Sequence, residues 1–248
     1  MLEMLSFIDD ICTKNDIPYW LDSGTLLGAV RHGGYIPWDD DTDIVIPKDH
    51  YKKFKNILLH NNPSHKYILQ CHETDNHFFG SWDVLRDLGS EYISDSPLHN
   101  YRNYRGLQID IFITDDNAIP LLARICEYYQ WYFITRPLIK GHGKQLLGFI
   151  RTSHWILHHL LRPLSHFPAW LHIREEYTFK PNSRKSIKKK HIFPLLRMDF
   201  EGNQFNVPAD TDNYLKTEFG NWEQIPPESE RIQHDVEIRL HPYGILKQ

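Results

Sequence analysis

The chain has 248 residues and a formal net charge of −4, with 41% hydrophobic and 24% charged residues. This composition is ordinary for a globular protein, the length is enough to bury a core, and the acidic balance argues against a nucleic-acid partner. Three scattered cysteines, Cys12, Cys71 and Cys126, exclude a disulfide framework and a paired-cysteine zinc site. The N-terminus lacks signal-peptide features and no stretch of about 18 residues is free of charge, so we expect a cytoplasmic protein without a membrane span.

Hydrophobic spacing in chain order predicts alternating helices and strands in the first half. We expect helices over residues 2–14, 25–31 and 49–59, and strands over residues 17–21, 44–46, 67–70, 77–86, 90–94 and 109–114. After residue 117 the spacing is helical to about residue 172, with a basic loop over 180–190, a strand or hairpin over 200–207 around Gly202 and a short helix over 212–219. The pattern predicts an α+β fold with a mixed sheet and a helical middle segment.

Four aspartates lie within a five-residue window, at Asp39, Asp40, Asp41 and Asp43. In an extended strand alternate side chains share a face, so Asp41 and Asp43 would point the same way while Thr42, Ile44 and Ile46 point into a core. Two carboxylates on one face form half of a site for a hard cation such as Mg²⁺, which would offset their repulsion. A solvated acidic turn would explain the aspartates equally well if they stood alone.

A second acidic strand favours the metal site. In RGLQIDIFITDD, Asp110 faces away from Ile109, Ile111 and Ile113, and a carboxylate in a buried strand is costly unless it is paired or bound to metal. If this strand lies beside residues 41–46, Asp110 completes a triad suited to displacement at phosphorus.

The segment DSGTLLGA places Ser23, Gly24 and Thr25 at the start of a predicted helix. Free backbone N–H groups and the helix dipole favour a phosphate there. Many Ser-Gly turns serve only as helix caps, so the signal gains weight from the acidic strands that follow.

These motifs carry a family resemblance. YWLDSGTLLGAVRHGGYIPWDDDTDIVI closely resembles the first motif of the LicD family, which includes fukutin and fukutin-related protein. RGLQIDIFITDD is similar to the second motif, and residues 200–227 are similar to the C-terminal one. The resemblance implies a nucleotidyltransferase-like mixed sheet flanked by helices, with a core over 1–116, a divergent helical segment over 117–198 facing acceptor or membrane, and a C-terminal motif over 199–248 that packs back on the core.

The resemblance also implies a Mg²⁺-dependent phosphotransferase, with Mn²⁺ as a substitute metal. It would move phosphocholine, ribitol phosphate or a similar group from a CDP-alcohol to a sugar hydroxyl of a cell-surface glycan (lipopolysaccharide, teichoic acid or capsule), releasing CMP. The acceptor would be an oligosaccharide or a lipid-linked glycan. The metal-binding and catalytic positions of the family fall on Asp41, Asp43 and Asp110, and its phosphate element falls on Ser23 and Gly24.

Other residues have predicted supporting roles. Asp39 would orient the metal site, while Asp40 would only be solvated. Arg31, Arg86 and Arg105 are candidates for clamping phosphate oxygens, although each suits a structural salt bridge equally well. Trp38 and Trp82 could stack on the cytosine or surround a choline group, with core packing as the alternative for both. These residues complete the predicted site.

Three other functions remain open at this level. A nucleotidyltransferase could use the same triad and release pyrophosphate, and a non-catalytic relative could bind a glycan. The spacing of His154, His158 and His159 could offer ligands to zinc, although no Cys or acidic partner is close in sequence.

The helical middle segment contains an amphipathic stretch over residues 146–164. Leucine, isoleucine and phenylalanine recur at 3–4 spacing, Arg151, His158 and Arg162 fall on the other face, and Trp155 flanks the boundary. This pattern is typical of a helix lying in a membrane interface, and it also suits a helix that packs its apolar stripe on the core. The first interpretation predicts peripheral attachment to the inner face of the cytoplasmic membrane.

Overall fold

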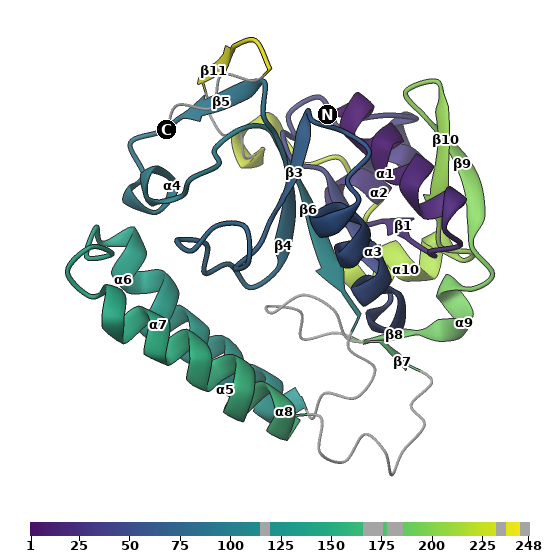
Figure 1. The fold of residues 1–248 in the computed structure, drawn as a ribbon. Coiled ribbons are helices and arrows are strands. Elements are labelled where there is room, and N and C mark those ends of the chain that lie inside the picture. Colours follow the sequence, from purple (N-terminus) through teal and green to yellow (C-terminus); the bar gives the residue numbers. More distant parts are fainter. Residues whose placement is uncertain (115–119, 166–175, 178–185, 232–236, 244–248) are drawn as a thin grey trace.

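The computed structural model describes residues 1–114, 120–165, 176–177, 186–231 and 237–243. The fold is α+β, as the sequence predicts, with a mixed five-stranded sheet flanked by helices (Figure 1). The strand order is β1-β2-β6-β4-β3. Strands β2 and β6 are parallel and the other neighbours are antiparallel. The strands are β1 (Trp20–Leu21), β2 (Asp43–Ile46), β6 (Gln108–Ile113), β4 (Asp83–Asp87) and β3 (Tyr67–Gln70).

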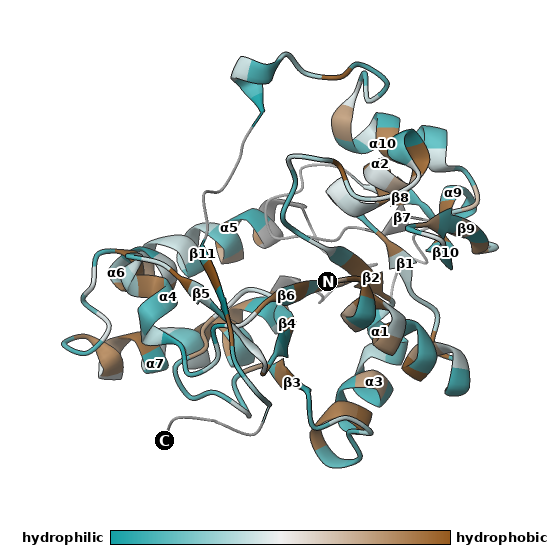
Figure 2. Ribbon diagram, turned by 90° about the horizontal axis from the view of Figure 1, so that it is seen from above, coloured by the Kyte–Doolittle hydropathy of each residue, from teal (hydrophilic) through white to brown (hydrophobic). Residues whose placement is uncertain are grey.

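The N-terminal helices flank this sheet. They are α1 (Leu2–Lys14), α2 (Ser23–His32) and α3 (Lys48–His60). Helix α1 buries Leu5, Ile8 and Cys12 because these residues recur on one side of the helix. They pack with the buried strand residues Ile44 and Ile111 in the main core. Figure 2 shows hydrophobic residues on the central strands and mixed colouring on the surrounding helices.

The chain after residue 186 returns to this core. It forms β8 (Ile187–Lys188), α9 (Lys189–Ile192), the hairpin β9 (Leu196–Phe200) and β10 (Asn203–Val207), and α10 (Thr211–Phe219). The hairpin turns at Gly202, which has φ +74° and confirms the predicted turn. A short 3₁₀ helix, η4 (Glu228–Glu230), follows, and β7 (Glu176–Tyr177) pairs with β8.

Two antiparallel helical rods form the middle segment. The first consists of α5 (Pro120–Gln130), the π-helical turn η1 (Trp131–Thr135) and α6 (Arg136–Ile139). The second consists of α7 (Leu147–Ile156), the π-helical turn η2 (Leu157–Leu161) and α8 (Arg162–Ser165). Pro137 and Pro163 lack the N–H that would bond to the carbonyl four residues earlier, and that carbonyl lies inside a π turn in both rods. The rods share a small apolar core with Phe79.

Several element boundaries differ from the sequence predictions. The strand expected over 77–86 begins only at Asp83, and residues 78–82 instead line a cavity that faces the helical rods. The strand expected over 17–21 contains only two residues. Strand β5 (Ser90–Ile93) forms, but it pairs with β11 (Glu237–Leu240) outside the main sheet, next to α4 (Pro97–Tyr101). The predicted helix end over 166–172 and most of the basic loop over 180–190 lie outside the described residues.

None of the described helices combines the length and the low polarity that crossing a bilayer requires.

Candidate active site

The two acidic strands are neighbours in the sheet. Strands β2 and β6 run parallel with Asp43 directly opposite Asp110, and register partners in a sheet point to the same face. The backbone N–H of Asp110 also donates to the carbonyl of Thr42, at 2.8 Å. The adjacency on which the predicted triad depended is therefore present.

The acidic loop before β2 gathers three more carboxylates. Asp39, Asp40 and Asp41 are the only described His, Cys, Asp or Glu trio whose ligand atoms all lie within 4.8 Å of one another. Gly24 lies in close contact with this loop, since a Cβ added at Gly24 would stand 2.2 Å from Oδ2 of Asp39. The absence of a side chain at Gly24 therefore allows the start of α2 to approach the carboxylates.

Asp110 lies in a strongly perturbed environment. Burial raises its pKa to about 6, and repulsion from Asp41 adds to the rise. A hydrogen bond from Trp82 and attraction to Arg86 and Arg102 act in the opposite direction. Gln108 also donates from Nε2 to Oδ1 of Asp110, at 2.7 Å. Asp110 is thus a carboxylate held among donors and cations close to the acidic loop.

Arg86 is the predicted phosphate-binding arginine that the sheet brings to the carboxylates. It lies opposite Gln108 in the β4–β6 register and is only 1% exposed. Its Nε donates to Gln70 at 2.8 Å and its Nη1 to the carbonyl of Gly106 at 2.7 Å, while Nη2 has no hydrogen-bond partner among the described residues. Burial lowers the pKa of Arg86 to about 9. A buried guanidinium with one unused nitrogen fits an anionic ligand.

Two further residues at the carboxylates were not predicted. Arg102 follows α4, is attracted to Asp110 and Asp75, and lies over the ring of Phe78 at 5.2 Å. Tyr92 lies in β5, where burial and the charges of Asp40 and Asp41 raise its pKa to about 12. Both approach the site from outside the sheet. No local pattern marks them, because their positions depend on how the segment 88–107 folds over the sheet.

The predicted phosphate element at the start of α2 has mixed roles. Ser23 has a positive φ of 50°, and its hydroxyl contacts carboxylates of Asp22 and Glu218 at 3.3 and 3.4 Å. Thr25 is buried, and its hydroxyl accepts from the backbone N–H of Asp43 at 2.9 Å. Thr25 therefore fixes α2 against the first residue of β2 and positions Asp43.

A buried hydrogen-bond chain holds the C-terminal segment on the same junction. Trp20 donates from Nε1 to the hydroxyl of Tyr214 at 3.0 Å, and that hydroxyl donates to Oδ1 of Asp22 at 2.7 Å. All three side chains are fully buried. Helix α10 is thus connected through a polar link to the residue immediately before Ser23.

The other two predicted arginines have structural partners. Arg31 donates from Nη1 to the carbonyls of Trp222 and Gln224, at 2.9 and 3.3 Å. Arg105 pairs with Glu91 at 2.5 Å. The structure therefore gives Arg31 and Arg105 the structural contacts that the sequence left open.

The two predicted stacking tryptophans also differ in their surroundings. Arg231 lies over the ring of Trp38, at 4.2 Å from its centroid, and His32 contacts the same ring edge-on. Trp82 packs on Phe112 with ring centroids 5.1 Å apart and hydrogen bonds to Asp110. Trp82 is therefore the tryptophan that adjoins the Asp110 carboxylate.

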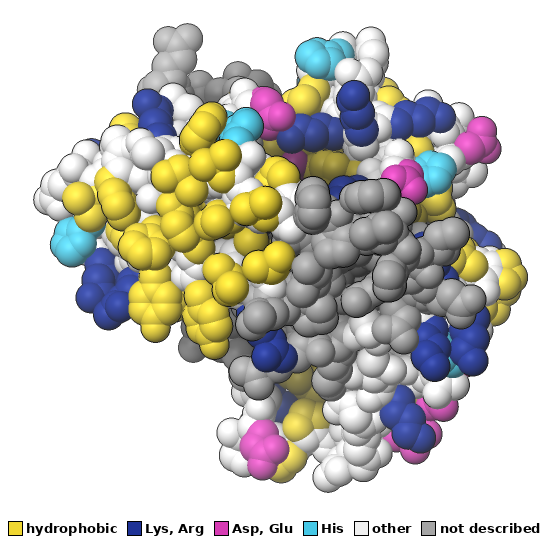
Figure 3. Space-filling model, turned by 90° about the horizontal axis from the view of Figure 1, so that it is seen from below, with side chains coloured by type: hydrophobic (Ala, Val, Ile, Leu, Met, Phe, Trp, Pro, Cys, Tyr) yellow, Lys and Arg dark blue, Asp and Glu magenta, His cyan; other side chains and the backbone are white. Residues whose placement is uncertain are grey.

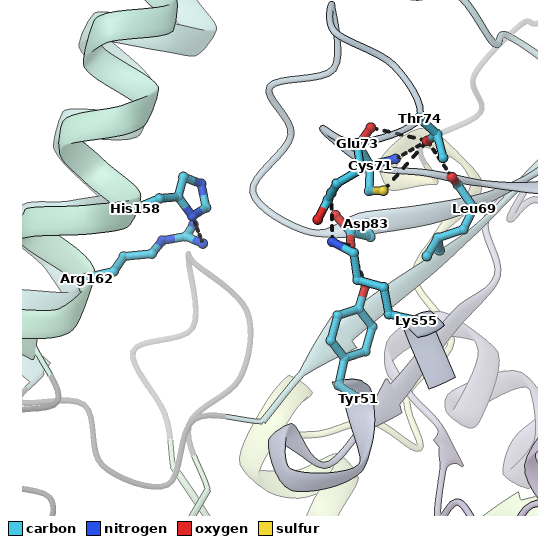
Figure 4. A network of polar contacts seen from close by, with 9 residues as sticks. All are labelled: Tyr51, Lys55, Leu69, Cys71, Glu73, Thr74, Asp83, His158 and Arg162. Carbon is cyan, nitrogen blue, oxygen red and sulfur yellow. Dashed lines mark hydrogen bonds and ion pairs between the residues drawn. The ribbon is translucent and has the colours of Figure 1, made fainter. Parts of the chain in front are cut away.

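The histidines of the second rod do not assemble the predicted zinc site within the described residues. His154 and His158 lie with ring centroids 4.2 Å apart, but His159 stacks on Trp155 instead. Burial lowers the pKa of His154 to about 4 and of His158 to about 3, so both are neutral at pH 7. Figure 4 shows His158 and Arg162 pointing toward the core, where Tyr51, Lys55 and Glu73 surround Asp83.

A cavity of about 220 Å³ lies between the rods and the sheet. Trp82, Gln108 and Arg102 form its wall nearest Asp110, and Trp131, Glu127 and Gln130 line it from the first rod. Burial raises the pKa of Glu127 to about 7. The side chain of Gln130 donates to the carbonyl of Phe79, while its Oε1 is buried without a partner among the described residues. We refer to this space as the seam cavity.

Comparisons with known proteins find similar sequences. Residues 16–120 match the family model described as LicD/FKTN/FKRP, nucleotidyltransferase domain. The chain is 25% identical to the lipopolysaccharide cholinephosphotransferase LicD of Haemophilus influenzae, over 95% of this chain and 93% of that protein. Residues 16–120 are therefore similar to the nucleotidyltransferase domain of the LicD family.

Two other relatives match shorter stretches. An uncharacterised protein of Rickettsia prowazekii is 30% identical over 55% of this chain and 58% of its own length. Human ribitol 5-phosphate transferase FKRP is 43% identical over 44 residues, which are 18% of this chain and 9% of that protein.

Proposed function

We propose that this protein transfers a phosphorylated alcohol from a CDP-alcohol to a sugar hydroxyl of a cell-surface glycan and releases CMP. The observation that carries the proposal is the pairing of Asp43 with Asp110 beside the acidic loop. The names of two relatives support the reaction class, since one is a cholinephosphotransferase acting on lipopolysaccharide and the other a ribitol 5-phosphate transferase.

The proposed cofactor is Mg²⁺, with Mn²⁺ as a substitute. The donor set fits a hard cation, because every candidate ligand is a carboxylate oxygen. Asp41, Asp43 and Asp110 would hold the metal, with Asp39 positioned against Gly24 to orient them. When bound, the cation would neutralise charge on the donor phosphates and on the leaving CMP.

The chain's own residues then have defined tasks. The acceptor hydroxyl attacks the distal phosphorus of the CDP-alcohol, its proton passes to a carboxylate for which Asp110 is the candidate, and the bond between the two phosphates breaks. Arg86 offers the unused Nη2, and Arg102 offers a second guanidinium on the cavity side of Asp110. Both would bind phosphate oxygens, and both remain charged at neutral pH.

The seam cavity is the proposed site for the alcohol part of the donor. It adjoins Asp110 through Gln108 and Trp82, so a phosphate near the carboxylates could extend its alcohol into it. Trp131 and Glu127 would attract a cationic group through ring faces and charge. This chemistry favours choline over an uncharged polyol such as ribitol.

A ligand screen tests the proposal. Purified protein with Mg²⁺ is mixed with CDP-choline, CDP-ribitol, CDP-glycerol or CDP-ethanolamine, and the unfolding midpoint is measured, since only ligands favouring the native state raise it. We expect the largest rise with CDP-choline, and expect Glu127→Gln to reduce that rise more than the exposed control Glu223→Gln does. If none of the four donors raises the midpoint, the proposed donor class is wrong. If CDP-ribitol exceeds CDP-choline, the head-group assignment is wrong and the reaction class stands.

A further inference from the structure

The second helical rod turns several polar side chains toward the protein, whereas an amphipathic helix on a globular protein normally turns them toward solvent. Ser153 is buried, and the polar side chains of His154, His158 and Arg162 turn inward, two of them toward the core in Figure 4. Ile150 and Leu157 also face inward and fill the small core with Phe79. The predicted apolar stripe of the second rod is therefore divided, and only part of it packs on the protein.

The outward face of the rods is aromatic. Six aromatic side chains there are 43 to 61% exposed, and we call them the aromatic patch: Tyr128, Trp131, Tyr132, Phe133, Phe149 and Trp155. Phe133 and Phe149 join the two rods, with ring centroids 6.1 Å apart. Figure 3 shows hydrophobic side chains gathered into one broad area over this part of the molecule. An exposed apolar area of this kind marks a binding surface in a soluble protein.

Positive charge accompanies the aromatic patch. Across residues 120–165 the sequence has six Lys or Arg residues and a single acidic residue, whereas the whole chain has 28 Lys or Arg and 32 acidic residues. Five of the six cations are exposed: Arg124, Arg136, Lys140, Lys144 and Arg151. Lys and Arg side chains appear at the rim of the hydrophobic area in Figure 3. The rods are therefore a cationic segment of a chain whose net charge is −4, as is the basic stretch over 180–190.

We propose that the aromatic patch docks on the surface of an anionic lipid bilayer. Tryptophan and tyrosine rings partition to the headgroup region, and surrounding Lys and Arg residues are attracted to anionic lipids. A second copy of this chain is a poorer occupant, because a symmetric interface would bring two cationic rims together. The described helices are too short and too polar to span the bilayer, so the contact is peripheral.

Docking would place the seam cavity beside the membrane. Trp131 is shared by the patch and the cavity lining, so a rod lying on lipid brings the cavity close to the headgroups. This consequence rests on the proposed function: a glycan acceptor carried on a lipid would then meet the donor at the bilayer surface. The docking itself depends only on the patch and its charge.

Liposome co-sedimentation tests the docking. The full chain is mixed with vesicles of phosphatidylcholine alone or containing roughly one third phosphatidylglycerol, at low and high salt. We expect binding to the anionic vesicles at low salt, and weaker binding at high salt because salt screens part of the attraction. Lys140→Glu/Lys144→Glu/Arg151→Glu should lower the partition coefficient by at least roughly 100-fold, because each of the three lost cations is worth about fivefold and the new carboxylates add repulsion.

Two comparison variants distinguish binding through the aromatic patch from a non-specific effect of net charge. Phe133→Ser/Phe149→Ser should weaken binding to anionic vesicles while the cations remain. Lys14→Glu/Lys52→Glu/Lys216→Glu makes the same change in net charge at exposed residues of α1, α3 and α10, and it should retain most of the binding. Wild-type protein that stays in the supernatant with anionic vesicles at low salt would overturn the proposal. So would equal loss in the two charge-reversal variants, or a concentration-dependent dimer that Phe133→Ser/Phe149→Ser abolishes. The readout needs no catalysis, so it is independent of the proposed activity.

Discussion

Replacement of Asp110 by Asn should stabilise the metal-free protein while abolishing activity. The wild-type carboxyl has a pKa raised to about 6 by burial and by Asp41. A rise of about two units from its ordinary value corresponds to at most about 3 kcal/mol of lost folding free energy above pH 6, since one unit is worth about 1.4 kcal/mol. Water and the neighbouring arginines reduce this cost, so we expect a gain of roughly 1–2 kcal/mol. Asn keeps an acceptor for Gln108, so the packing should hold.

The pH dependence gives this prediction a direction. Because the folded-state pKa is raised, the folded wild type binds a proton more readily than the unfolded chain between about pH 4 and 6. Wild-type stability relative to Asp110→Asn should therefore decline as the pH rises through that window and stay lower above it. Urea unfolding in EDTA at pH 4 and pH 7.5 measures the difference, which should be near zero at pH 4.

A matched control is available in the same sheet. Asp83 also has a pKa raised by burial, but it pairs with Lys55 at 3.4 Å and accepts from Tyr51. Asp83→Asn should destabilise the protein because it breaks these contacts. If Asp110→Asn destabilised the protein as much as Asp83→Asn at pH 7.5, Asp110 would be a structural residue. Near wild-type turnover in Asp110→Asn would contradict its place in the triad.

Three further predictions concern other parts of the chain. Gly24→Ala should force Asp39 to move, because the new Cβ would stand 2.2 Å from its Oδ2. Calorimetry should then show that the affinity for the CDP-alcohol donor falls more than about tenfold, or 1.4 kcal/mol. Unchanged affinity would mean that Gly24 serves only the geometry of the helix. Tyr214→Phe should lower the free energy of unfolding in urea by about 1–3 kcal/mol, because Trp20 and Asp22 lose the buried hydroxyl that both contact. A decrease below about 0.5 kcal/mol would contradict a stabilising role for this hydroxyl. Burial lowers the pKa values of His154 and His158 to about 4 and 3. As the pH drops, the two histidines therefore become protonated in the unfolded chain before they do so in the folded protein. The free energy of unfolding should fall as the pH drops from about 6.5 toward 4. The double variant His154→Gln/His158→Gln should show a flatter curve, and an equally steep one would refute the assignment.

The acidic strands could be predicted because their signals are local. Alternating apolar and acidic residues fix which face Asp110 occupies, and together with Asp110 the carboxylates around Asp41 favour a compensating positive charge. The structure confirms that β2 and β6 are neighbours, which places Asp43 opposite Asp110. The metal itself and the roles of the triad remain predictions.

The arginines could not be ranked from the sequence. Arg31, Arg86 and Arg105 have similar local surroundings, but only Arg86 lies next to Gln108 across the β4–β6 register. Arg102 was missed because it lies in an irregular segment that reaches Asp110 only after long-range folding. Such contacts depend on sheet register and loop packing, which no periodicity in the chain encodes.

The middle segment was predicted to be helical, and the described part is. Periodicity alone could not show which apolar residues would pack on the protein core. A helix that buries all of its apolar residues and one that buries only some of them have the same sequence spacing. In the structure Ile150 is buried while Phe149 is about half exposed. Arg162, which the sequence placed with the outward cations, instead turns inward beside His158 at 3.5 Å.

The central claim is tested most directly by identifying the phosphorus-containing products of one reaction. Protein, Mg²⁺, CDP-choline and an oligosaccharide acceptor are followed by phosphorus NMR. The account predicts CMP and an acceptor-linked phosphodiester in equal amounts, with neither formed by Asp41→Asn or Asp110→Asn. Release of pyrophosphate from a nucleotide substrate would identify a nucleotidyltransferase instead. Absence of turnover with every CDP-alcohol and glycan acceptor would contradict the account.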